Sequence, residues 1–266
     1  MADFLRDNPV SRFAKGFLYP FLSARFIGKN PSLWKYVLVP FLVNLLIFSL
    51  AVYFGLDFFN DFVVRQIPQG EAWYWGLVYY FLWLVALAVT AVLVFFCFTV
   101  VGNLISSPFN DLLSERTEEL LSGTRNEERF SLGLFWKDSL RTLGTEAKKM
   151  SLFVIVMLLI LPLNLIPGFG NALYSLLALL LTLFFLAFEY LGYVMARKRL
   201  SFREQRRYVL GRTPLMLGFG TGVLAILAIP FLQFICIPAG VVGATRLWFD
   251  LSGTEAMEKD ERPGTD

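Results

Sequence analysis

Long apolar runs without a charged residue dominate the sequence. Four of them cover Tyr36 to Leu56, Ala72 to Asn110, Ser151 to Phe188 and Thr213 to Thr245, and the shortest has 21 residues. A helix needs about 20 apolar residues to cross the ~30 Å hydrocarbon core of a bilayer. The pattern therefore predicts an all-α integral membrane protein, with a single polytopic membrane domain over residues 1–252.

The positions of Lys and Arg predict how the runs cross the membrane. These residues gather before the first run, between the second and third, and between the third and fourth, whereas only Arg65 lies between the first two. Cytoplasmic loops collect positive charge, so the segment around Arg65 is predicted outside and the other connections inside. The first two runs then form two long transmembrane helices, over about 32–56 and 72–107. Each later run must enter and leave on the cytoplasmic side.

Proline and glycine interrupt both later runs and predict helical hairpins over about 150–194 and 213–250, because proline breaks a helix and glycine permits a turn. The apolar tips and the short arm Ser151 to Leu161 favour hairpins that penetrate only partly, with six complete spans as the alternative. Matched breaks of this kind often mark a transporter's substrate path, although they also fit simple helix ends. The residues predicted at the two tips are Pro167, Gly168, Gly170, Pro238 and Gly240.

Amphipathic segments flank the apolar runs. Residues 10–28 carry apolar side chains at helical spacing among basic ones, which predicts an N-terminal helix in the cytoplasmic interface. Residues 109–123 predict a second amphipathic helix, with Ser106-Ser107-Pro108 ending or kinking the transmembrane helix before it. Residues 253–266 are polar and are expected to form a disordered tail.

Composition excludes several classes of function. Among 266 residues there is no His and there are only two Cys, so the usual metal ligand and the usual general base near neutral pH are missing. No glycine-rich phosphate loop occurs either. We expect no enzyme activity, no metal and no cofactor. The net charge of +3 is too small to indicate nucleic-acid binding.

The basic segment from Arg197 to Arg212 has two interpretations. The simpler is that these side chains keep the segment in the cytoplasm and attract anionic membrane lipids. The alternative is an electropositive vestibule that collects anions.

Four motifs occur in order along nearly the whole chain: VPFLVN at 39–44, PFNDLLSE at 108–115, IPGFG at 166–170, and IPFL to IPAGVVGAT at 229–245. Together they resemble the CysZ family of bacterial inner-membrane sulfate transporters, related to the etoposide-induced-protein-like membrane domain. The resemblance implies a homo-oligomeric, multi-pass permease or channel in the inner membrane, which brings in sulfate for cysteine biosynthesis. A non-transporting scaffold or lipid-interacting protein of the same fold is the alternative.

The resemblance also points to a candidate anion site. In the family, a glycine, an apolar residue and two arginines at the start of the first long helix bind sulfate. Helix N-termini favour oxyanions, and paired guanidinium groups add bidentate contacts. One cation remains here, and lysine does not reproduce the fork of arginine. The matching residues are Ser32, Leu33, Trp34 and Lys35.

Further polar residues are candidates for a pathway beyond this site. Asn44 and Asn110 lie at the inner part of the first run and at the end of the second. Glu115, Arg116 and Glu119 could line an entrance, although carboxylates on an amphipathic helix usually form only a solvated face.

Overall fold

The computed structural model describes residues 8–58, 73–124, 132–229 and 232–261; they are helical except at turns and short connections, with no strand among them. The chain divides into two compact units. We call Lys35–Phe109 the two-helix unit, and Met1–Trp34 with Asn110–Asp266 the hairpin unit. The protein is an all-α membrane protein: four described helices are long and apolar enough to cross a bilayer.

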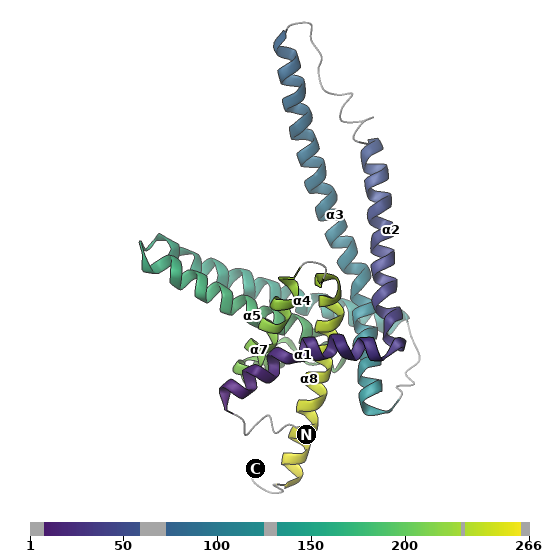
Figure 1. Ribbon diagram of the computed structural model, residues 1–266, viewed down its shortest axis with the longest axis vertical. Helices are drawn as coiled ribbons and strands as arrows, with labels where there is room; N and C mark the ends of the chain where they lie inside the picture. Colours follow the sequence, from purple (N-terminus) through teal and green to yellow (C-terminus); the bar gives the residue numbers. More distant parts are fainter. Residues whose placement is uncertain (1–7, 59–72, 125–131, 230–231, 262–266) are drawn as a thin grey trace. The chain divides into compact units, whose positions relative to one another are not determined.

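The two-helix unit consists of α2 (Trp34–Phe58), except its first residue, and the first part of α3 (Trp73–Ser122). The two helices run antiparallel in Figure 1. Their apolar stretches, Pro31–Gly55 and Tyr74–Val92, are candidate spans with few buried residues, as expected for surfaces that face lipid. The two predicted transmembrane helices are therefore present.

The helix α3 does not end where the sequence predicted. It passes through Pro108 without interruption, so residues 109–123 are its last turns rather than a separate helix, and they end at Gly123 with φ +70°. A proline removes one helical hydrogen bond. Burial of Asn110, Leu113, Ser114 and Thr117 directly after it holds the following turns in place.

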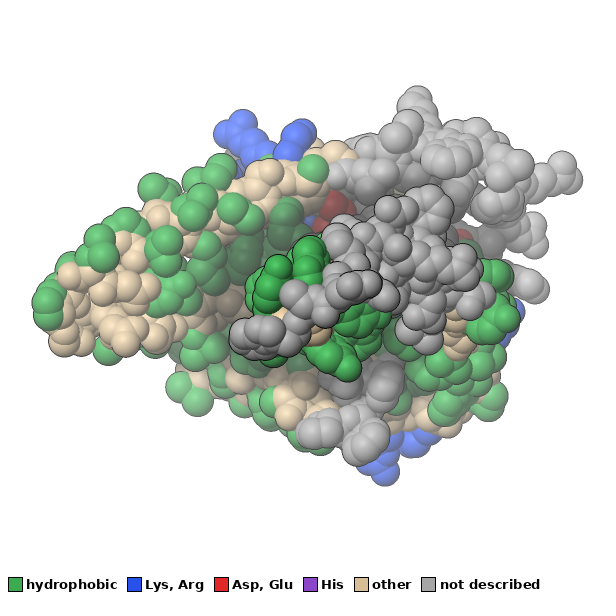
Figure 2. Space-filling model, turned by 90° about the horizontal axis from the view of Figure 1, so that it is seen from above, with side chains coloured by type: hydrophobic (Ala, Val, Ile, Leu, Met, Phe, Trp, Pro, Cys, Tyr) green, Lys and Arg blue, Asp and Glu red, His purple; other side chains and the backbone are tan. Residues whose placement is uncertain are grey.

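The first predicted hairpin is formed by α4 (Leu132–Ile160), the 3-10 turn η4 (Leu161–Leu165) and α5 (Phe169–Arg197). Gly168 turns the chain with φ +77°. At Gly170 a side chain would overlap the carbonyl of Leu163, so glycine is required there too. On the face seen in Figure 2, hydrophobic side chains lie along this hairpin up to its projecting end, among backbone and other side chains.

The first arm of this hairpin is longer than the segment Ser151 to Leu161 from which partial penetration was predicted. Because α4 begins at Leu132, its 29 residues measure about 43 Å at the helical rise, and both arms contain a candidate span. How deeply the hairpin enters the bilayer stays a prediction.

The second hairpin consists of α7 (Thr213–Leu227) and α8 (Gln233–Glu261), and α7 is preceded by the short helix α6 (Phe202–Leu210). With 15 residues, α7 measures about 22 Å, which is less than the ~30 Å core and fits partial penetration. The sequence predicted Pro238 and Gly240 at the tip of this hairpin. Both instead lie inside α8, where they are buried. Gly240 makes room for Tyr190: a Cβ would lie 2.6 Å from its ring.

The end of α8 also differs from the sequence prediction. The helix continues to Glu261, well into the segment 253–266 for which disorder was predicted, and residues 262–266 lie outside the described part of the chain.

Glycines pack α7 into the centre of the hairpin unit, between α5 and α1 (Pro9–Lys29), which lies across α7 and α8 in Figure 1. Gly218 and Gly222 face α1, against the backbone of Phe13 and Phe17, and Gly220 faces the backbone of Leu183 on α5. Small residues let helices approach this closely in membranes. The predicted N-terminal helix is present, with one face buried in the protein; its location in the interface stays a prediction.

Candidate functional site

Two helices of the hairpin unit present polar side chains to each other at steps of four residues. On α3 these are Asn110, Ser114 and Glu118, and on α5 they are Tyr193 and Arg197. Residues four apart lie on the same face of a helix. We call these five residues, together with Lys198 of α5 and Thr245 of α8, the polar seam.

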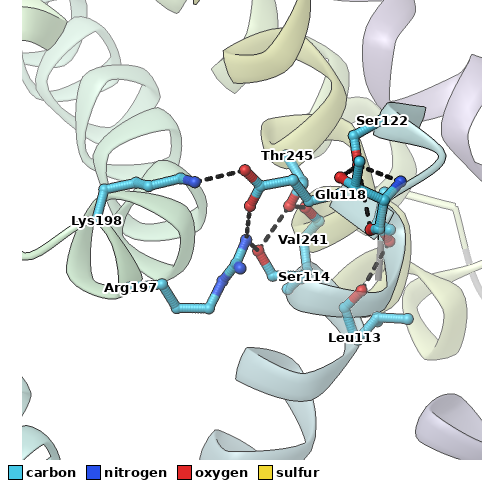
Figure 3. A network of polar contacts seen from close by, with 10 residues as sticks. Leu113, Ser114, Glu118, Ser122, Arg197, Lys198, Val241 and Thr245 are labelled. Atoms are coloured by element: carbon cyan, nitrogen blue, oxygen red, sulfur yellow. Dashed lines mark hydrogen bonds and ion pairs between the residues drawn. The ribbon is translucent and has the colours of Figure 1, made fainter. Parts of the chain in front are cut away.

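Direct contacts join the two sides of the polar seam. Asn110 Nδ2 donates to the hydroxyl of Tyr193 at 3.3 Å. One turn further, Arg197 Nη2 donates to Ser114 Oγ and to Glu118 Oε2, both at 2.9 Å. Lys198 Nζ lies 2.6 Å from the other carboxylate oxygen of Glu118. Figure 3 shows Arg197 and Lys198 both pointing to Glu118.

A chain of hydrogen bonds continues from Arg197 into the core. Thr245 Oγ1 donates to the carbonyl of Val241 at 2.8 Å, so it can only accept from Ser114, whose oxygen lies 2.8 Å away. Ser114 in turn accepts from Arg197. The donor and acceptor of each hydrogen bond are therefore fixed along the chain, from Arg197 through the two hydroxyl groups to the carbonyl of Val241. Hydrogen bonds in such a chain strengthen one another. Both hydroxyl residues are buried.

The seam carries more positive than negative charge. Burial raises the pKa of Glu118, but hydrogen bonds and charge from Lys198 and Arg197 outweigh it and lower that pKa, so Glu118 is ionised. Burial raises the pKa of the neighbouring Asp111 to about 7, against the opposing effect of Arg197. The buried Nε of Arg197 has no hydrogen-bond partner within the described residues. A guanidinium N–H of this kind can donate a hydrogen bond to an oxyanion or to water.

Asp111 predicts a pH-dependent stability. Because its pKa rises from 3.8 to about 7, the folded protein holds this proton more tightly than the unfolded chain. Stability is then highest below about pH 4 and falls as the pH rises toward 7, by up to about 4 kcal/mol from this group. Asp111→Asn is expected to flatten the dependence and to raise the unfolding temperature at about pH 8. Thermal unfolding in detergent measures both; an equally steep dependence in the variant contradicts the prediction.

A second buried charge cluster joins α4 to α5. The side chain of Lys149 is 1% exposed, with Nζ 2.5 Å from Glu146 and 3.7 Å from Glu189. Nζ also lies 5.3 Å from the ring centre of Phe188. Because Gly192 has no side chain, it leaves space for the Nζ of Lys149. Charges inside membrane-spanning segments are costly and usually functional. Glu189 is one turn before Tyr193, so this cluster continues the seam along α5.

The predicted anion site at the start of the first long helix is only partly formed. The side chain of Leu33 is fully buried, whereas Ser32, Trp34 and Lys35 are exposed. The backbone N–H groups of Leu33 and Trp34 bond within the 3-10 turn Pro31–Leu33, so neither is available to an anion. Lys35 Nζ lies 4.8 Å from the ring centre of Tyr36.

The other predicted pathway residues are separated. Asn44 donates to Ser106 Oγ at 2.9 Å within the two-helix unit, whereas Asn110 belongs to the polar seam. Arg116 pairs with Glu119 on its own helix. The charge of Glu115 acts on Asp111 and raises its pKa further. Whether these residues line an entrance stays a prediction.

Sequence reasoning missed most of the polar seam. It weighed Arg197 and Lys198 only as members of the basic segment, as topological charges or as part of an anion-collecting vestibule, and it gave Ser114, Glu118, Tyr193 and Thr245 no role in a site. A usable signal was present, because polar residues recur every four positions in 110–118 and in 189–197.

Comparison with known proteins gives a consistent result. The sequence profile of the family described as "Sulfate transporter CysZ/Etoposide-induced protein 2.4" matches residues 19–238. A relative from Pseudomonas paraeruginosa (strain DSM 24068 / PA7), named "Sulfate transporter CysZ", is 32% identical over 86% of this chain and 92% of its own. A relative of the same name from Vibrio parahaemolyticus is 30% identical over 88% of this chain and 93% of its own.

Proposed function

Because this chain belongs to the sulfate transporter CysZ/Etoposide-induced protein 2.4 family, we propose that it is a permease or channel for sulfate or a related oxyanion. The observation that carries the proposal is the similarity, over 86% of the chain, to a protein named "Sulfate transporter CysZ". The membrane would be the bacterial inner membrane, and the imported sulfate would supply cysteine biosynthesis.

The polar seam is the part of the chain that we assign to the anion. A divalent anion loses hydration when it leaves water, so a pathway must offer several donors. Arg197 and Lys198 supply cationic donors next to the carboxylate of Glu118, and Arg197 Nε is buried without an acceptor among the described residues. The hydrogen bonds to Ser114 and Glu118 keep the guanidinium in place. This arrangement supports an anion contact better than the start of α2 does.

The remaining features of the proposal follow from this role. The protein would work without a metal, a cofactor or a chemical reaction, with two hairpins penetrating the bilayer partly, as a homo-oligomer surrounded by membrane lipids and without nucleic acid. A scaffold that does not transport is not favoured, because relatives with transporter names match nearly the whole chain.

Uptake of radiolabelled sulfate into proteoliposomes tests the proposal. Vesicles with the folded full-length protein are expected to accumulate sulfate faster than empty vesicles. Uptake equal to that of empty vesicles, with protein that elutes as a single species from the same preparation, would contradict transport.

Lys35→Ala tests the start of α2 separately from transport. Its side chain is exposed, and no ion pair involves it within the described ranges. If Lys35 is the remaining cation of the anion site, its loss is expected to weaken sulfate binding by about tenfold, the contribution of one charge-assisted contact. Calorimetry of the purified protein measures this. Unchanged affinity removes Lys35 from the site and leaves the polar seam as the candidate.

A further inference from the structure

Helix α6 presents a surface of arginines that the proposed transport function does not use. Arg203, Arg206 and Arg207 are all exposed, and their spacing places them on one face of the helix. Leu210, one turn further on the same face, is 56% exposed. We call these four residues the arginine face of α6.

The opposite face fixes α6 to the rest of the hairpin unit. Gln205 and Val209 are buried, and the ring of Phe202 lies 6.0 Å from that of Phe188 on α5. The ring of Tyr208 lies 4.7 Å from that of Trp248 on α8. A capping box at Ser201 and Glu204 holds the first turn. The arginine face is therefore a rigid surface.

No described residue neutralises the three arginines. None of them takes part in an ion pair within the described ranges. Glu204 is the only carboxylate in α6, and it accepts a hydrogen bond from the backbone N–H of Ser201 at 2.6 Å. The face therefore has three positive charges that attract an anionic partner from outside the chain.

The direction of α6 relative to α7 is consistent with a position at the membrane surface. The axes of α6 and α7 differ by 94° across a break of two residues. If the apolar α7 enters the bilayer as the start of the proposed second hairpin, a bend of this size places α6 along the plane of the membrane. The density of Arg and Lys in 197–212 assigns this segment to the cytoplasmic side. Anionic lipids give the cytoplasmic leaflet its negative surface potential.

We infer that the arginine face of α6 is a binding site for anionic phospholipid headgroups of the cytoplasmic leaflet. The guanidinium groups contact the lipid phosphate, for which their planar fork is suited. Leu210 lies against the start of the acyl chains, as apolar residues of interfacial helices do. A bound headgroup holds α6 at the membrane surface. It thereby also fixes the position at which α7 enters the membrane.

Binding of phosphatidylglycerol to the full-length protein tests this inference. Native mass spectrometry of the detergent-solubilised protein measures the apparent affinity for the first bound lipid, with phosphatidylcholine as the neutral comparison. The variant R203Q/R206Q/R207Q is expected to lose at least about tenfold in affinity for phosphatidylglycerol, since each basic residue near an anionic surface contributes about fivefold. The single variant R206Q, expected to lose about fivefold, replaces it if the triple variant does not fold.

A matched control removes three exposed cations elsewhere, in R25Q/K29Q/K148Q. It is expected to keep the affinity of the unchanged protein, and R203K/R206K/R207K is expected to keep most of it. Equal losses in both glutamine triples indicate a diffuse charge effect and overturn the inference, as does wild-type protein that prefers phosphatidylcholine.

Free sulfate is the other oxyanion that could occupy this face. Sodium sulfate and sodium chloride at the same ionic strength are expected to weaken phosphatidylglycerol binding equally, because both act through screening. Displacement by sulfate alone would assign the face to the transported anion and overturn the lipid site. None of these measurements depends on uptake, so failure of the transport proposal leaves the inference intact.

Discussion

Gly220→Ala is expected to prevent the hairpin unit from folding. The added methyl group would overlap the backbone carbonyl of Leu183 on α5, and a backbone atom cannot swing aside as the end of a side chain can. Because Gly218 and Gly222 hold α1 equally close on the opposite face of α7, α7 cannot move away from α5 without a clash. The cost therefore exceeds that of ordinary overpacking, which is about 1–3 kcal/mol.

Gly28→Ala is the matched control. Gly28 lies near the end of α1, and beyond its own helical turn no atom of the described residues lies within 4 Å of a Cβ at this position. Alanine favours a helix over glycine by about 1 kcal/mol, so this variant is expected to be as stable as the unchanged protein or more so.

Size-exclusion chromatography of the protein in detergent, combined with thermal unfolding, distinguishes the two variants. Gly220→Ala is expected to aggregate or to express poorly, and Gly28→Ala to elute as the unchanged protein does. A Gly220→Ala variant of normal stability would mean that α5 and α7 are not packed as closely as the structure has them.

Arg197→Gln is expected to lower sulfate uptake by at least about tenfold while the protein stays folded. Arg197 is the residue that joins α3, α5 and, through Ser114 and Thr245, α8. Glutamine removes the charge and cannot reach Ser114 and Glu118 together. The loss of one charge-assisted contact to a bound anion accounts for at least about tenfold.

The fold should survive this change for an electrostatic reason. Breaking a fully buried ion pair costs about 3–5 kcal/mol, but the side chains of Arg197 and Glu118 are 18% and 20% exposed, which reduces the cost. Lys198 also remains to pair with Glu118. Thermal unfolding of the same preparations separates a loss of transport from a loss of structure.

Two variants complete this test. Arg197→Lys keeps the charge but not the fork, so intermediate uptake is expected. Lys148→Gln removes an exposed cation that takes part in no ion pair within the described part of the chain, and it should transport normally. Uptake by Arg197→Gln equal to that of Lys148→Gln would remove the polar seam from the pathway.

The seam illustrates what sequence reasoning could find and what it could not. Asn110 was a candidate because an amide at the end of a long apolar run is conspicuous. Arg197 was not singled out from the basic segment 197–212, for which topology was the simpler explanation and an anion-collecting vestibule the alternative. Only the packing of α3 against α5 brings Arg197 within hydrogen-bond distance of Ser114 and Glu118.

The prolines also show which features of the fold the sequence could and could not predict. Pro167 and its neighbours were correctly assigned to a turn, since Gly168 and Gly170 stand beside it at positions that require glycine. Pro108 and Pro238 suggest breaks just as strongly, yet both lie inside helices. A missing hydrogen bond costs less than the contacts that the continuous helices make, and these contacts come from residues distant in the chain.

By itself, the sequence determined that this is a helical membrane protein, that its first two apolar runs form two long helices and that the later runs fold back as hairpins. These properties follow from two local quantities, the length of the apolar runs and the positions of the charged residues. The thickness of the bilayer and the sidedness of its charge act on both directly. Tertiary structure alone decided which helices run on through their prolines, which glycines are indispensable and which charges meet. These depend on distances of a few ångströms between residues far apart in the chain, and no local pattern carries that information.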